Sequence, residues 1–378
     1  MLRSISRSKF FSTVVVLGAP GDVFLLSHDV LRAKLGLSTR ATVERIDPDT
    51  LETIERSPRL PGGPMWPGGM AVHRNGNLYV VYGRFAHRLD RRCTVTGAME
   101  LPVNQPHNGF VILDTGLIVT KNLSERHHAI LSVIDPESML QVHTPLEVPE
   151  PSVARLSSDG EMVYVVGTRS VFRYVWGEKS GLARDPTWVF NYVGTSQQTH
   201  GWDMVLAGGH AWFMDNGRHR YRTNMFAAGV APTANRLIRV SLQDADDSEM
   251  IDVSGLPGGS ITNPPVVDVT RQIVVGFDSA NRVMRAWRFG GARLQPLWEK
   301  TGIGCASHMI FYPDTGELVT NDFDKGGEHV VMLDIETGTE RGRTCIGGPM
   351  QGVVFPATGW NRDFYWCSMA KVARVFVG

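Results

Sequence analysis

Residues 307–322 read SHMIFYPDTGELVTND, and this segment is the clearest copy of a repeated pattern. It contains a short apolar run, a turn at Asp-Thr-Gly, a second apolar run and then polar residues, a pattern that predicts a β-hairpin. The chain repeats this pattern with variations at residues 69–83, 109–122 and 152–167. Because one hairpin cannot bury its own apolar face, the recurring hairpins predict units stacked around a common core.

Eight copies of the hairpin follow one another at a spacing of about 40 to 50 residues, which is typical of propeller blades. Third and fourth strands follow the hairpin, as at residues 42–47 and 51–55, with a turn signal between them. The first strands of the eight units are predicted to begin near Thr13, Gly69, Asn108, Ser152, Gly201, Asn263, His308 and Gln351.

The last unit lacks a fourth strand, and residues 2–8 precede the first unit. Pairing these residues with the last unit would close a ring and remove an exposed sheet edge. We therefore predict an all-β chain that forms a single β-propeller domain over residues 1–378, with eight four-stranded blades. Seven blades are the alternative if the first unit is irregular, and a short helix is expected within residues 30–37. A solenoid would need capping units with polar outer faces, and neither end has one.

The composition excludes several classes of protein. Lys+Arg and Asp+Glu number 38 each, so the formal net charge is zero, and nothing suggests a nucleic-acid-binding surface. No apolar run approaches the length of a membrane span. None of the four cysteines forms a CxxC pair, which argues against a thiolate zinc site and favours a reduced, cytoplasmic setting.

The N-terminus has two interpretations. Arg3, Arg7 and Lys9 precede an apolar run at residues 10–19, which resembles a signal peptide and would make the protein secreted. The same residues fit the repeated hairpin, with a turn at residues 19–22. We favour the strand interpretation and expect a cytoplasmic protein.

The repeat also predicts where a site lies. In a propeller the first strands line the central channel, and their starts share one face with the ends of the second strands. Ligand sites favour such a face, because many loops converge there. Histidine, asparagine and aspartate gather at these positions.

Three histidines, His107, His200 and His308, lie at first-strand starts. They are predicted as catalytic acid–base groups, with Asp203 beside His200, because histidine titrates near neutral pH. Alternatively they bind a transition metal, or each hydrogen-bonds the backbone of a neighbouring blade.

Oxygen-bearing side chains occupy the second-strand ends. Hard cations such as Ca²⁺ prefer carboxylate and amide oxygens, so the sequence predicts a divalent cation at the channel mouth. The alternative is a hydrogen-bonded rim without an ion. The candidate ligands are Asn122, Asp215, Asp278, Asn321 and Asp322.

A second group of residues on this face is predicted to contact the substrate. Arg220 lies in a long insertion at residues 218–232, which would act as a lid and meet an anionic group, unless it is simply a basic surface loop. The remaining candidates are Trp66, Tyr82, Trp202, Asn263 and Gln351.

The hairpin units and the polar channel mouth resemble the calcium-dependent propellers of the SMP-30/gluconolactonase/strictosidine-synthase-like superfamily. That resemblance implies a six-bladed ring and one metal held by Glu, Asn and Asp from different blades. Asn122, Asp278, Asn321 and Asp322 would take such parts here, whereas no clear glutamate counterpart stands at a first-strand start.

The sequence thus predicts an enzyme acting on a small molecule in the channel mouth, either a lactonase-like hydrolase or a lyase or cyclase. A serine-nucleophile elbow, a phosphate loop and a dinucleotide fingerprint are all missing, so no nucleotide cofactor is expected. The alternative is a non-catalytic propeller that binds a ligand or a protein on its rim. Oligomeric state is not predicted.

Overall fold

A computed structural model describes residues 2–29, 32, 35–63, 68–218, 229–324, 327–348, 355–368 and 370–377. Three predicted site residues, Trp66, Arg220 and Gln351, lie outside these ranges, as do four of the eight residues of the helix expected at residues 30–37.

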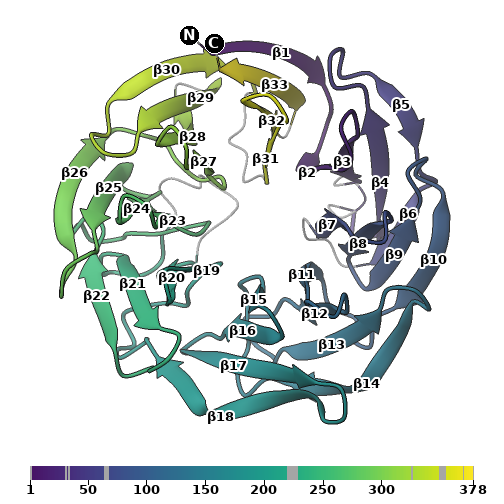
Figure 1. Cartoon of the computed structure of the whole chain (residues 1–378), viewed down its shortest axis with the longest axis horizontal. Coiled ribbons are helices and arrows are strands. Elements are labelled where there is room, and N and C mark those ends of the chain that lie inside the picture. The colour runs from purple at the N-terminus through teal and green to yellow at the C-terminus, as the bar shows by residue number, and fades with distance from the viewer. Residues whose placement is uncertain are drawn as a thin grey trace.

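The described strands form eight antiparallel sheets arranged as blades around a central channel (Figure 1). Blade 1 contains β2 (Ser12–Leu17), β3 (Val23–His28), β4 (Thr39–Ile46) and β5 (Thr53–Arg56), and β6 (Leu60–Gly63) also pairs with β4. Blade 2 contains β7 (Gly69–Val72), β8 (Leu78–Tyr82), β9 (Phe85–Leu89) and β10 (Val95–Glu100). Blade 3 contains β11 (His107–Ile112), β12 (Ile118–Asn122), β13 (Ile130–Asp135) and β14 (Leu140–Glu147). Blade 4 contains β15 (Ser157–Asp159), β16 (Met162–Val166), β17 (Ser170–Gly177) and β18 (Gly181–Asn191).

The second half of the ring continues in the same order. Blade 5 contains β19 (Val205–Ala207), β20 (His210–Met214), β21 (Arg236–Ser241) and β22 (Ser248–Asp252). Blade 6 contains β23 (Val266–Asp268), β24 (Ile273–Asp278), β25 (Val283–Arg288) and β26 (Gln295–Thr301). Blade 7 contains β27 (Ile310–Tyr312), β28 (Glu317–Asp324), β29 (Gly327–Asp334) and β30 (Glu340–Cys345). Blade 8 contains β31 (Ala357–Thr358), β32 (Asp363–Cys367), β33 (Lys371–Val377) and β1 (Leu2–Ser8).

The two ends of the chain close the ring, as the sequence predicted. β1 pairs antiparallel with β33, from Leu2 opposite Val377 to Ser8 opposite Lys371 (Figure 1). β1 is therefore the outermost strand of blade 8, although it stands at the start of the chain. The prediction of eight four-stranded blades is confirmed, and the six-bladed ring implied by the family resemblance is not the one found.

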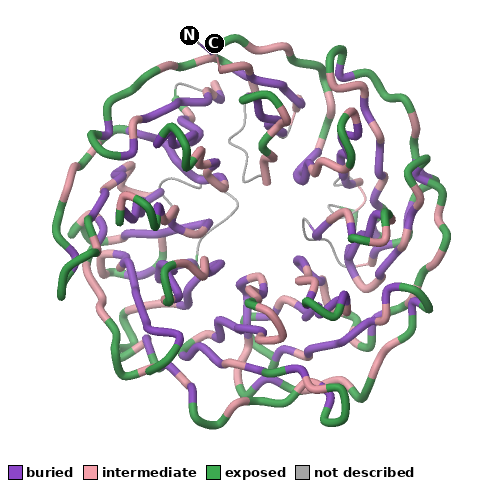
Figure 2. Tube along the Cα trace, in the orientation of Figure 1, coloured by how far each residue is buried: buried purple, intermediate pink, exposed green. Residues whose placement is uncertain are grey.

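Burial follows position within a blade (Figure 2). Every residue of β8 and of β12 is buried, whereas the outer strand β10 alternates between half-buried and exposed residues. The middle strands lie between neighbouring blades, so both of their faces are covered by apolar side chains. The cores are thus the interfaces between blades, and they hold each blade at a set position around the channel.

A recurring aspartate shapes the turn between the third and fourth strands. The Oδ1 atoms of Asp47, Asp135 and Asp334 each accept backbone N–H groups from the residues two and three positions further on. These backbone hydrogen bonds contribute to lowering the pKa of Asp47 and of Asp135. Such local side-chain bonds explain why the acidic turn signal recurs in the sequence.

In the part of the chain that the structure describes, no helix is both long and apolar enough to cross a bilayer.

Candidate functional site

Three charged or titratable side chains stand at one level of the ring. Arg155, Asp203 and His308 each precede the innermost strand of their blade by two residues, in blades 4, 5 and 7. The inner strands of these blades begin two to five residues later than predicted, and irregular segments at the channel end carry the three side chains. Because the innermost strand of every blade faces the central channel, residues at equivalent positions before these strands come close to one another there.

Asp203 joins the other two residues. Its Oδ1 atom accepts the backbone N–H of Arg155 at 2.7 Å. Its Oδ2 atom lies 3.5 Å from Nε2 of His308 and 4.0 Å from Nε of Arg155. We call Arg155, Asp203 and His308 the channel triad.

Aromatic and backbone contacts extend the channel triad to two further blades. The Arg155 guanidinium donates to the carbonyl of Gly68 at 2.6 Å, just before β7 of blade 2. Its central carbon lies 3.4 Å from the ring centre of Phe355, just before β31 of blade 8. The His308 ring packs on the same phenyl ring, with 4.3 Å between the ring centres. Five blades therefore meet at this point.

The environment sets the charge of each member of the triad. Burial lowers the pKa of His308 below its ordinary value despite the opposing effect of Asp203, so the imidazole is neutral at pH 7. Burial alone would raise the pKa of Asp203, but the contact with His308 and the charge of Arg155 together lower it. Burial lowers the pKa of Arg155 to about 10, which leaves the guanidinium charged. The triad thus pairs the neutral imidazole of His308 with the ionised carboxylate of Asp203, whose charge is balanced by Arg155.

Lys121 lies close enough to Asp203 to interact with it electrostatically. It is the fourth residue of β12 and is fully buried. Its Nζ atom donates to the carbonyls of Ser152 at 3.2 Å and Asn122 at 3.4 Å. Burial lowers the pKa of Lys121 to about 7, an effect that the charge of Asp203 opposes. Its amine is therefore in part neutral at pH 7.

His200 has a different partner from the one predicted. Its Nε2 atom lies 3.6 Å from Oε1 of Glu125, whose other oxygen is 3.5 Å from Nε of Arg218. Its Nδ1 atom is 3.1 Å from the carbonyl of Gly201. The closeness of His200 and Asp203 in the sequence suggested that they form a pair. Both residues lie in an irregular segment, and the side chain of Asp203 contacts His308 instead.

His107 is fully buried and stays apart from the triad's contacts. Its Nδ1 atom lies 2.9 Å from the carbonyl of Gly83 and 3.1 Å from that of Gln105. Burial lowers its pKa to about 4, so this imidazole is neutral at pH 7. These backbone contacts match the alternative in which a histidine ties together neighbouring blades.

The five predicted cation ligands all accept or donate hydrogen bonds within the protein. Asp215 accepts the backbone N–H of Arg236 at 2.6 Å and its Nε at 2.8 Å, and Asp322 accepts the N–H of Gly304 at 2.7 Å. Asp278, Asn321 and Asn122 likewise accept backbone N–H groups, from Ser260, Ala306 and Ile130.

Among the described residues, no group of three or more His, Cys, Asp or Glu side chains could hold a metal ion. The contacts therefore do not support a cation held by these five residues, and the calcium site stays a prediction.

The remaining substrate-contact candidates pack between blades. Tyr82 is fully buried, its hydroxyl lies 3.0 Å from Oγ1 of Thr39, and burial raises its pKa to about 12. Asn263 donates to the carbonyl of Ala306 at 2.5 Å, in the next blade. Trp202 is buried, and its indole N–H donates to the carbonyl of Gly217 at 2.8 Å.

Sequence reasoning missed Arg155, Lys121, Glu125 and Phe355. Lys121 left a signal, because the fourth residue of the second strand is Val81, Val165 and Phe213 in blades 2, 4 and 5. A lysine at this apolar position departs from the repeat. Arg155 was missed because the first strand of its unit was placed five residues too early.

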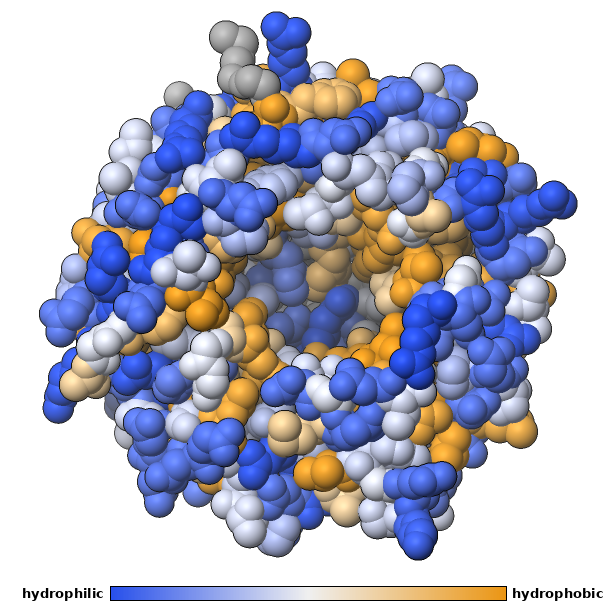
Figure 3. Space-filling model, viewed as in Figure 1, coloured by the Kyte–Doolittle hydropathy of each residue, from blue (hydrophilic) through white to orange (hydrophobic). Residues whose placement is uncertain are grey.

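The channel appears in the space-filling view as a hollow at the centre of the ring, with hydrophilic residues at its depth (Figure 3).

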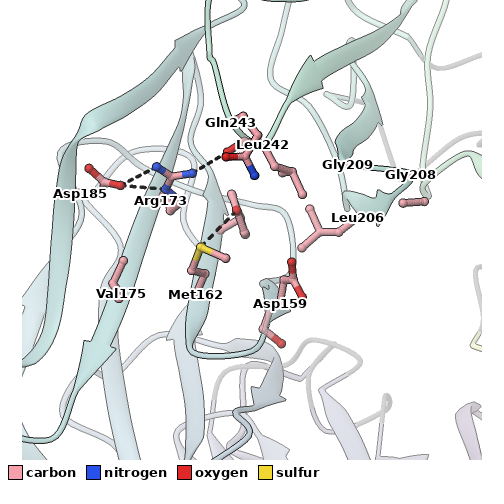
Figure 4. Close-up of a pocket in the computed structure, with 13 residues that line it drawn as sticks. Asp159, Met162, Arg173, Val175, Asp185, Leu206, Gly208, Gly209, Leu242 and Gln243 are labelled. Carbon is pink, nitrogen blue, oxygen red and sulfur yellow. Dashed lines mark hydrogen bonds and ion pairs between the residues drawn. The ribbon is translucent and has the colours of Figure 1, made fainter.

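A separate pocket of about 550 Å³ lies between blades 4 and 5 (Figure 4). It is lined by Asp159 and Ala207, at the opposite ends of β15 and β19 from the channel triad. Its one arginine, Arg173, is held by Asp185 and by the carbonyl of Leu242. None of the three residues of the channel triad lines this pocket, and the candidate site is the triad.

No family model and no curated protein matches the chain. Among solved structures, the Dos1 propeller has a TM-score of 0.63 at 9% identity, and the match covers 100% of this chain and 94% of the Dos1 chain. The dihydro-heme d1 dehydrogenase NirN in complex with DHE has a TM-score of 0.57 at 14% identity, covering 94% and 68%. Virginiamycin B lyase from Staphylococcus aureus has a TM-score of 0.51 at 8% identity, covering 82% and 94%.

These identities are low, so the likeness concerns the fold. The strand topology and the sequence repeat agree that this chain is an eight-bladed β-propeller, and the likeness to the Dos1 propeller supports the propeller fold.

Proposed function

We propose that the protein is an enzyme that removes a proton from a small molecule bound in the central channel, with His308 as the base. The observation that carries the proposal is the channel triad, in which Asp203 of blade 5 faces His308 of blade 7 at 3.5 Å. The propeller neighbours include proteins named as a lyase and a dehydrogenase, which supports an enzymatic use of this fold.

The orientation of His308 suits it to accept a proton. Nε2 faces Asp203, so an N–H at that atom points to the carboxylate and leaves Nδ1 as the acceptor. The side chain is 22% exposed, whereas that of Asp203 is only 9% exposed. Asp203 then stabilises the imidazolium that forms, since an adjacent carboxylate favours the charged ring.

Arg155 acts through Asp203 and through the shape of the site. Its backbone N–H and its charge keep the carboxylate ionised. Its guanidinium, lying between Asp203 and the Phe355 ring, also provides positive charge near the reacting group. A cation in a water-poor site stabilises a developing oxyanion or enolate.

Two reaction types fit a single histidine base. In a lyase or cyclase reaction the base takes a proton from the substrate carbon or hydroxyl, and the protonated ring returns it to the leaving group. In a hydrolase the same base activates water. We favour the lyase or cyclase type, because the residues of the triad can supply and return the proton without a second reactant.

The test is a screen of lactones, esters and unsaturated carboxylic acids, followed by mass spectrometry of the products. An isomer of unchanged mass, or a pair of products whose masses add to that of the substrate, supports a lyase or cyclase. A gain of one water mass supports a hydrolase.

Once a substrate is found, H308Q is expected to lower kcat by about 100-fold or more. The exposed His128 provides the matched control, H128Q. Turnover of H308Q equal to that of H128Q would overturn the proposal.

A further inference from the structure

A second site lies at the seam where the ring closes. We propose that a groove of blade 1 binds a small molecule that carries a phosphate group, held by Arg40 and Arg59. This site is independent of the channel triad and of the proposed proton-transfer reaction.

Two adjoining pockets make up the groove. One, of about 410 Å³, extends from Lys9 and Phe10 to Arg56 and Arg59. The other, of about 230 Å³, contains Arg40 and Asp29. Ser27, Thr42 and Arg59 line both, so the two pockets form one continuous groove.

The fold explains why this surface is polar. Ser27 on β3 and Thr42 on β4 are cross-strand partners, and Glu44 follows Thr42 by two residues on the same face. Ser12 on β2 contacts Ser27 across 3.0 Å between their hydroxyl oxygens. Residues Lys9 and Phe10 link β1, the outer strand of blade 8, to β2, the inner strand of blade 1. The groove therefore crosses the seam between the last blade and the first.

The charges of the groove do not cancel. Glu44 is buried, and both Lys9, at 2.7 Å, and Arg56 pair with it. Burial would raise the pKa of Glu44, but these two cations lower it, so the carboxylate is ionised. Burial lowers the pKa of His28 to about 3, which keeps that ring neutral. The lining then has four cations against two carboxylates, an excess of two positive charges: Lys9, Arg40, Arg56 and Arg59 against Asp29 and Glu44.

Two of the four cations are free to bind a ligand. Neither Arg40 nor Arg59 makes a side-chain hydrogen bond or ion pair with any other residue that the structure describes, and both are exposed. An arginine presents a planar fork of N–H groups that matches two oxygens of a phosphate. The hydroxyl of Thr42, which lines both pockets, adds a neutral donor.

The rest of the groove indicates the ligand class. A combined volume larger than a single phosphate ion leaves room for an organic part. Phe10, which is 68% exposed, lines the groove with Lys9 and offers an apolar surface for that part. A phosphomonoester or diphosphate of a small organic molecule therefore fits better than inorganic phosphate alone.

The experiment is isothermal titration calorimetry of the whole protein with pyrophosphate, glucose 6-phosphate and citrate. We expect both phosphates to bind, more weakly at high salt, and citrate to bind at least tenfold more weakly. R40Q and R59Q are each expected to weaken binding about tenfold, since each removes a charge-assisted hydrogen bond.

The matched control is R293Q, which changes an exposed arginine of blade 6 outside the groove. Equal affinity of R59Q and R293Q for pyrophosphate would overturn the proposal, as would tighter binding of citrate or no binding of either phosphate. A T42V variant with unchanged affinity would overturn the role of the hydroxyl. H308Q should bind pyrophosphate as the unmodified protein does, so a failure of the proposed channel chemistry is distinguishable from a failure of this site.

Discussion

Asp203 and His308 belong to blades 5 and 7, yet the carboxylate oxygen Oδ2 of one lies 3.5 Å from the imidazole nitrogen Nε2 of the other. The two residues are separated by 104 residues of sequence, so no local element brings them together. They meet because the blades close into a ring. The pair exists because both residues stand two positions before an innermost strand.

Removing the carboxylate should change how His308 titrates. Asp203 raises the pKa of His308 against the effect of burial. In D203N the pKa of His308 should therefore fall further, because the stabilising charge is lost and the burial stays. Imidazole NMR signals followed against pH measure this change. The exposed His128 is the internal reference, because it pairs with Glu147 and not with Asp203. An unchanged or higher pKa of His308 in D203N would contradict the pairing.

Acid should destabilise the fold through its buried histidines. Burial lowers the pKa of His28 to about 3 and those of His87 and His107 to about 4. Below pH 6.5 the unfolded chain binds protons that the folded chain does not, so the free energy of unfolding should fall as the pH drops from 6.5 to about 4. A shift of this size corresponds to about 3 kcal/mol for one histidine. Urea unfolding at pH 7.5 and pH 5 measures the part of this fall above pH 5, which is about 2 kcal/mol for one histidine.

H107Q should flatten this dependence, because it removes one of the groups that protonate on unfolding. H128Q is the control and should keep it, since that residue is exposed. Equal pH profiles for H107Q and the unmodified protein would show that His107 titrates normally in the folded state.

Lys121 should make the fold more stable in mild alkali. Its pKa falls from 10.5 to about 7 on burial, so between these values the unfolded chain binds one more proton than the folded chain. The free energy of unfolding should accordingly rise from pH 7 to pH 9 by up to about 3 kcal/mol from this residue. K121M should lack that part of the rise. The comparison variant K179M changes an exposed lysine and should retain it. Urea unfolding of both variants at the two pH values distinguishes these results.

The seam of the ring should depend on Leu2. This residue is buried in a cluster with Val375 and Ile346, although it stands at the start of the chain. L2A should lower the free energy of unfolding by about 2 kcal/mol, since it opens a cavity between β1 and its neighbours. R3A, at the adjacent exposed position, should change it little. Denaturant unfolding of the two variants tests whether β1 closes the ring in solution, and equal stabilities would argue against closure.

The repeat made the fold predictable. Alternating apolar runs with Asp-x-Gly turns, as at residues 307–322, encode hairpins locally, and their spacing implies blades. The missing fourth strand of the last unit was enough to assign residues 2–8 to it, a prediction that the β1–β33 pairing confirms. The turn aspartates Asp47, Asp135 and Asp334 could be recognised because their hydrogen bonds are made within a few residues.

The candidate site was only partly predictable. Alignment of the repeats selected His200 and His308, and Asp203 was named only as the residue beside His200 along the chain. It also treated the oxygens of Asp215 and Asp322 as open, although Arg236 and Gly304 donate to them. Those partners depend on how neighbouring strands and loops meet, and a repeat pattern carries no information on that.

Residue order alone was enough to predict the blades, their number and the closure of the ring, because hairpins, turns and apolar periodicity are short-range properties that repeat along the chain. Which polar residues meet in the channel depends on how the blades pack against one another. Arg155 contacts Asp203 from an irregular segment, and the side chains of Lys121 and Phe355 approach the triad from two other blades. The directions of these side chains depend on packing between blades rather than on residue order. The fold is thus encoded unit by unit, whereas the site arises where several units converge.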